Sequence, residues 1–101
     1  ELDDEFIMDA IGVRDREFVE YALAAKAGVS VEDVKKVMEL HAPKPTISLV
    51  WKAGFSMRTA LAVQREIAKV PSAEIMNPRG VTDYPLSKKE LEWQLDFLGL
   101  S

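Results

Sequence analysis

The fold is decided by the stretch Lys26-Ala27-Gly28-Val29-Ser30, which returns 26 residues later as Lys52-Ala53-Gly54-Phe55-Ser56. The match extends to both sides, because Leu23 aligns with Leu49 and Val34 with Ala60. Glycine readily takes the left-handed conformation that ends a helix, and serine caps the first turn of the next one. Each copy therefore predicts a helical hairpin that turns at Gly28 or Gly54 and continues into a helix capped by Ser30 or Ser56.

Outside the repeat, apolar residues recur at helical spacing and no stretch alternates in the manner of a strand. The predicted helices cover about 3–12, 15–27, 30–41, 46–53, 56–69 and 87–98. Asp15 and Ser87 are the expected N-caps of two of them, and Ser87 with Glu90 has the spacing of a capping box. Pro43 and Pro45 are expected to break the chain before the fourth helix. Residues 71–86 read as an irregular connector with one helical turn near 72–75.

These elements predict an all-α fold in a single domain over residues 1–101. Two tandem helical hairpins, at about 15–41 and 46–70, precede the connector and a C-terminal amphipathic helix at 87–98. Two hairpins fit a small stacked array and a compact bundle equally well. The expected inner sides include Phe6 and Ile7 in the first helix, Val31 and Val34 in the third, and Gln64 as a polar exception in the fifth.

Composition narrows the class of protein. The chain has 101 residues, a net charge of −4, 48% hydrophobic and 30% charged residues, which is typical of an ordinary globular domain. It has no cysteine, which excludes disulfides and thiolate chemistry, and its one histidine, His41, disfavours a histidine-built zinc site. No run approaches the roughly 20 apolar residues of a membrane span, and no signal peptide opens the chain. We therefore predict a cytoplasmic protein that does not contact a membrane.

The chain resembles a bacterial family that is known only as a domain of unknown function. The matching stretches are Asp15 to Ala24, Ala27-Gly28-Val29-Ser30, Lys52-Ala53-Gly54, Tyr84-Pro85-Leu86-Ser87 and Trp93-Gln94-Leu95-Asp96-Phe97. The resemblance implies an all-helical fold with hairpins similar to HEAT repeats, no enzyme activity, and a position in the C-terminal part of a longer protein. The chain begins at Glu1 rather than methionine, which fits that expectation.

The first hairpin also has the pattern of a helix-turn-helix from Leu23 to Met38. Its second helix opens with Glu32 and Asp33, which would repel phosphate. The second hairpin is better suited to DNA, because Arg58 stands at the equivalent place and Arg65 follows two turns later. A pI near 5.0 lacks the basic balance of a DNA-binding domain. Nucleic-acid binding is therefore the alternative function and not the preferred one.

Enzyme chemistry has little support in the sequence. No Walker loop, dinucleotide fingerprint or zinc-protease motif is present. The acidic residues Asp3, Asp4, Glu5 and Asp9 do not have the spacing of a calcium loop, and a solvated face is the preferred interpretation. His41 is expected to interact with a helix C-terminus, and Asn77-Pro78-Arg79-Gly80 is expected to form a turn rather than an anion site. We predict a non-enzymatic protein without a cofactor or a metal.

The helix at 87–98 carries the best indication of a partner. Leu91, Leu95 and Leu98 form one apolar stripe, and Trp93, Phe97 and Leu100 form a second one. A helix that is apolar on two sides is usually covered on both. Either the 71–86 connector covers the second stripe, or a protein partner or a second copy does. The preferred function is thus protein–protein interaction or regulation, with Trp93, Phe97, Leu100, Arg58 and Arg65 as candidate partner-binding residues.

Overall fold

A computed structural model describes residues 3–101, so Glu1 and Leu2 of the predicted domain lie outside the described residues. The chain is all-α. Its elements are α1 (Asp4–Gly12), α2 (Arg16–Ala27), α3 (Val31–Glu39), α4 (Pro43–Lys52), α5 (Met57–Glu66), a 3₁₀ turn (Ser72–Glu74) and α6 (Lys88–Leu98). Apart from one bridge between Arg79 and Asp83, residues 3–101 form no strand.

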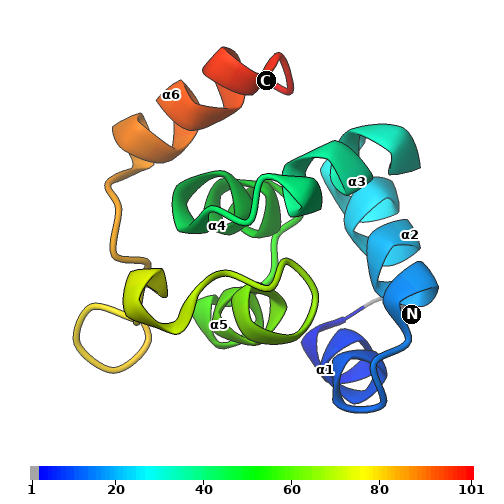
Figure 1. Cartoon of the computed structure of the whole chain (residues 1–101). Helices are drawn as coiled ribbons and strands as arrows, with labels where there is room; N and C mark the ends of the chain where they lie inside the picture. Colours follow the sequence, from blue (N-terminus) through cyan, green and yellow to red (C-terminus); the bar gives the residue numbers. More distant parts are fainter. Residues whose placement is uncertain (1–2) are drawn as a thin grey trace.

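Two helical hairpins form the centre of the molecule, as the repeat predicts. Helix α2 packs against α3, and α4 packs against α5. Helix α4 lies in the middle, because it also contacts α2, α3 and α6 (Figure 1). Helix α1 closes the structure by contacting α2 and α5, one helix from each hairpin. The chain measures 29 × 29 × 25 Å along its principal axes.

The predicted caps and turns explain why the helices begin and end in these places. Gly28 and Gly54 have φ values of 73° and 87°, the left-handed conformation expected at the two turns. The side chains of Asp15, Ser30, Ser56 and Ser87 each accept a hydrogen bond from the backbone N–H three residues later. Each of these bonds joins residues only three positions apart, so the sequence alone could predict it.

The prediction for the two prolines of the second hairpin is wrong. Pro43 and Pro45 do not break the chain before a helix at 46–53, because they occupy the first turn of a helix that already begins at Pro43. The first N–H groups of a helix have no partner within it, so a proline costs little there and its fixed φ suits the helix. The second hairpin therefore starts three residues earlier than predicted.

Two helices end earlier than predicted because non-glycine residues take the left-handed conformation. Helix α3 ends at Glu39 rather than His41, and α5 ends at Glu66 rather than Lys69. His41 and Lys69 both have a φ of 52°. The Val70 N–H then donates to the Gln64 carbonyl at 2.9 Å, which closes the end of α5.

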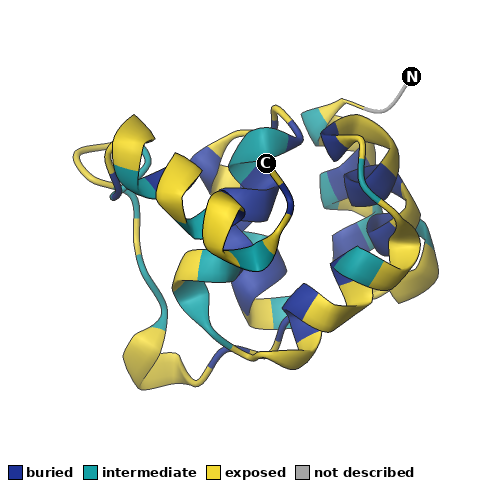
Figure 2. Cartoon of the chain, turned by 90° about the horizontal axis from the view of Figure 1, so that it is seen from above, coloured by how far each residue is buried: buried dark blue, intermediate teal, exposed yellow. Residues whose placement is uncertain are grey.

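The core runs between the hairpins and under α6 (Figure 2). Ile7, Val34 and Gln64 are buried as predicted. Phe6 and Val31 are not, because Phe6 is 54% exposed and Val31 is 36% exposed. None of the helices within residues 3–101 is long and apolar enough to cross a membrane.

Candidate interaction surface

Helix α6 lies on α4 through one of its two apolar stripes (Figure 1). Leu91 is 1% exposed and Leu95 is 3% exposed, and both belong to the central core. The Lys44 ammonium of α4 donates to the Glu90 carboxylate at 3.1 Å. Glu90 therefore makes only half of the predicted capping box: its N–H binds Ser87, while its carboxylate pairs with Lys44. These contacts fix which side of α6 faces outward.

The outward side of α6 carries an aromatic pair. Trp93 is 58% exposed and Phe97 is 75% exposed. Their rings stack on each other, with centroids 5.4 Å apart and planes 11° from parallel. The 71–86 connector does not cover them, so residues 3–101 leave Trp93 and Phe97 of the predicted stripe exposed to solvent. Figure 2 looks down on α6 and shows exposed residues along it.

Leu100 does not share this surface, although the sequence groups it with Trp93 and Phe97. Helix α6 ends at Leu98, and Gly99 follows it with a φ of 75°, which turns the chain. The Leu100 N–H then donates to the Leu95 carbonyl at 2.8 Å. The turn brings Leu100 back to the core, where it is 8% exposed. The open surface of α6 therefore consists of Trp93 and Phe97 with their charged neighbours.

The two arginines lie on α5, away from α6. Arg58 and Arg65 are both exposed and stand two turns apart on one face of the helix. The 71–86 connector runs along this face. Arg58 shares a cavity of about 430 Å³ with Pro78 and Val81, and Arg65 shares one of about 310 Å³ with connector residues near Ile75. The structure does not bring the arginines together with the aromatic pair.

Gln64 holds the connector in this position. Its side chain is fully buried, its amide nitrogen donates to the Met76 carbonyl at 2.9 Å, and its oxygen accepts from the Met76 N–H at 3.0 Å. A DNA-reading helix must enter the major groove with its side chains free. The connector lies beside α5, the helix that the helix-turn-helix pattern would place against DNA.

The turn between α4 and α5 is anchored from two distant segments. The Asp4 carboxylate accepts hydrogen bonds from the Ser56 N–H, the Ser56 hydroxyl and, at 2.6 Å, the Thr59 hydroxyl. Burial alone would raise the pKa of Asp4, but these bonds and the charge of Arg58 outweigh it and hold the pKa below 3.8. The Tyr84 hydroxyl donates to the Phe55 carbonyl at 2.7 Å, and burial with the nearby Asp4 charge raises its pKa. Asp4 thus links the first turn of α1 to the start of α5.

Four further polar contacts explain the roles of Glu20, Arg16 and His41. Glu20 is 3% exposed and pairs with Arg16 at 3.2 Å and Lys35 at 3.7 Å. Arg16 also donates to the Ile67 carbonyl at the end of α5, at 2.8 Å. The i, i+4 spacing of Arg16 and Glu20 was the available signal. The Nδ1 atom of His41 lies 2.7 Å from the Ala68 carbonyl oxygen, so His41 links the two hairpins rather than interacting only with its own helix.

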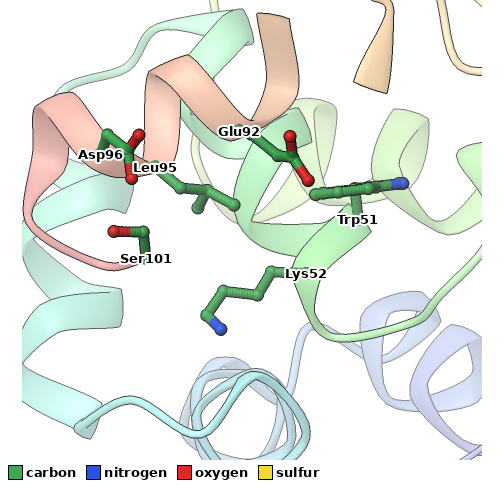
Figure 3. A pocket seen from close by; sticks show the side chains of 6 residues that line it. All are labelled: Trp51, Lys52, Glu92, Leu95, Asp96 and Ser101. Carbon is green, nitrogen blue, oxygen red and sulfur yellow. The ribbon is translucent and has the colours of Figure 1, made fainter. Parts of the chain in front are cut away.

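A cavity of about 540 Å³ opens between α4 and α6. Figure 3 shows Trp51 and Glu92 at one end, Asp96 and Ser101 at the other, and Leu95 and Lys52 between them. These six lining residues include no histidine and no buried charged group, and they form no nucleophile–base pair. We assign no reaction to this cavity.

Metal-binding side chains are not gathered in the described part of the chain. Among residues 3–101, no three histidine, aspartate or glutamate side chains come together to hold an ion. No family model, curated protein or solved structure matches the chain, so its functional interpretation rests on its own residues.

Proposed function

We propose that this chain is a non-enzymatic helical domain that binds a protein through the outward side of α6. The observation that carries the proposal is the exposed stack of Trp93 and Phe97. The two exposed rings do not contribute the buried apolar area through which aromatic side chains usually stabilise a fold. Aromatic residues are also enriched in the buried centres of protein interfaces. The side of α6 that faces the core is already filled by leucines, so the aromatic pair adds nothing to the seating of the helix on α4.

Photo-crosslinking at position 93 tests this proposal. We expect a benzophenone amino acid in place of Trp93 to capture a protein in the cells that naturally make this chain. Tyr21 of α2 is the matched control position, because it is also aromatic and is 56% exposed compared with 58% for Trp93. An adduct that forms from position 93 and not from position 21, and that disappears in a Phe97→Ala background, supports the proposal. Equal adducts from both positions, or none from either, would overturn it.

The nucleic-acid alternative makes a different prediction. If Arg58 and Arg65 contacted phosphate, a random DNA duplex would bind at low salt and dissociate steeply as salt rises. We expect no such binding in fluorescence anisotropy, because the chain is acidic and the connector lies beside α5. Salt-sensitive binding that is lost in an Arg58→Glu, Arg65→Glu variant would instead establish the helix-turn-helix interpretation.

A further inference from the structure

We infer that the partner of the α6 surface is a second copy of this chain, packed so that the two α6 helices run antiparallel. This inference rests on the proposed function and adds the identity of the partner. It is carried by the charges that flank the aromatic pair. Lys89, Trp93 and Asp96 are all exposed and follow one another at spacings of four and three, so they lie near one another on α6. Asp96 stands at the edge of this face, where it also lines the cavity between α4 and α6.

The charges on this face are self-complementary. Lys89 lies one helical turn before Trp93, and Asp96 directly precedes Phe97 near the C-terminal end of the helix. In an antiparallel pair related by a two-fold axis near Trp93, Lys89 of each copy lies opposite Asp96 of the other. The two Trp93 rings then meet at the axis, and each Phe97 ring lies beside the lysines of the other copy. Parallel packing would place Lys89 against Lys89 and Asp96 against Asp96.

The placement of these charges is unfavourable within a single chain. The helix dipole favours acidic residues at the N-terminus and basic residues at the C-terminus. The first turn of helix α6 holds Lys88 and Lys89 beside the acidic Glu90, and its last turn holds Asp96 and no basic residue. Among residues 3–101, neither Lys89 nor Asp96 forms an ion pair. An antiparallel neighbour supplies both missing partners, and it sets the N-terminus of one helix beside the C-terminus of the other.

The exposed area sets the expected strength of the dimer. A tryptophan or phenylalanine buries about 150–250 Å² when fully covered. At exposures of 58% and 75%, the four rings of a dimer would together remove roughly 500 Å² from water. A standard interface begins near 1,200 Å², and the flanking charged side chains supply only part of the difference. We therefore expect a weak, reversible dimer with a Kd on the order of 100 µM.

Sedimentation equilibrium on the purified chain, at concentrations up to about 1 mM and at low salt, tests this inference. We expect wild-type protein to dimerise, and Trp93→Ala, Phe97→Ala protein to stay monomeric with unchanged helical circular dichroism. Lys89→Asp and Asp96→Lys should each weaken the dimer about tenfold, because each turns both cross-pairs into repulsions. The double variant Lys89→Asp, Asp96→Lys restores the attractions and should dimerise like wild type. An equimolar mixture of the two single variants should form a heterodimer.

The possible outcomes separate this inference from the proposed function. Wild-type protein that is still monomeric at about 1 mM overturns the self-association. A dimer unaffected by Trp93→Ala, Phe97→Ala overturns it as well, since the contact then lies elsewhere. A dimer that is lost in Trp93→Ala, Phe97→Ala but has an unchanged Kd in both Lys89→Asp and Asp96→Lys overturns the antiparallel arrangement. If the wild type is monomeric while position 93 captures a different protein in cells, the proposed function stands and the inference fails.

Discussion

Replacing Gln64 with alanine should lower the free energy of unfolding by about 3 kcal/mol, one of the two largest effects expected from single substitutions in this chain. The Gln64 side chain is fully buried and makes two hydrogen bonds with the backbone of Met76. Its loss leaves the Met76 N–H and carbonyl without these partners and opens space in α5, and each unsatisfied buried group costs about 1–3 kcal/mol. Thermal unfolding of a 101-residue domain should then shift downward by roughly 12–24 °C.

Two further variants separate the hydrogen bonds from the volume of the side chain. Gln64→Met keeps most of the side-chain volume and removes both hydrogen bonds. We therefore expect it to lower the free energy of unfolding by most of the amount that Gln64→Ala does. Gln94→Ala truncates a half-buried glutamine of α6 and should cost less than about 0.5 kcal/mol. Hydrogen exchange of the Met76 amide should accelerate in both Gln64 variants. A Gln64→Met protein as stable as wild type would show that the connector is held by packing instead.

Local chemistry made the hairpins predictable from the sequence. Gly28 and Gly54 mark turns because a left-handed conformation strains other residues, and Ser30 and Ser56 mark helix starts because their hydroxyls cap a backbone N–H. These effects act over three or four residues, so a sequence displays them directly. The all-α fold and the tandem order of the hairpins are therefore confirmed, whereas the HEAT-like relationship stays a prediction.

The errors arose where a tertiary contact outweighs the local preference. His41 and Lys69 adopt the left-handed conformation without being glycine, and the ring of His41 is held by the Ala68 carbonyl from the other hairpin. Glu20 is buried, although it is charged, because Arg16 and Lys35 pair with it. Arg16 lies four residues from Glu20 within α2, but Lys35 and Ala68 belong to other segments of the chain, so no pattern within a few residues contains their contacts.

The candidate surface was predictable only in part for the same reason. The sequence shows that α6 is apolar on two sides, but it does not show which side α4 takes. The packing decides this: Leu91 and Leu95 enter the core, and Trp93 and Phe97 stay in water. Leu100 was grouped with the exposed pair because the helical period was extended past Gly99, where the chain turns back.

Leu91→Ala should therefore destabilise the protein much more than Trp93→Ala, although the two positions lie two residues apart on the same helix. Leu91 is 1% exposed in the interface with α4, and removing its side chain leaves a cavity that we expect to cost about 3 kcal/mol. Trp93 is 58% exposed, so its truncation should lower the free energy of unfolding by only about 1 kcal/mol, chiefly through the lost stacking on Phe97. Urea titrations at low micromolar protein measure both values below the concentration at which a weak dimer forms, so association does not contribute to the difference.

The comparison decides whether the aromatic pair belongs to the fold or to a partner. Phe97→Ala, at 75% exposure, serves as a second surface variant and should behave like Trp93→Ala. If Trp93→Ala destabilises the protein as strongly as Leu91→Ala, the indole is part of the core, and the interaction proposed for α6 fails. If only Leu91→Ala destabilises it, α6 is held on α4 by its leucines alone. The exposed rings are then not needed to hold α6 in place, which is the result that the proposed protein-binding role requires.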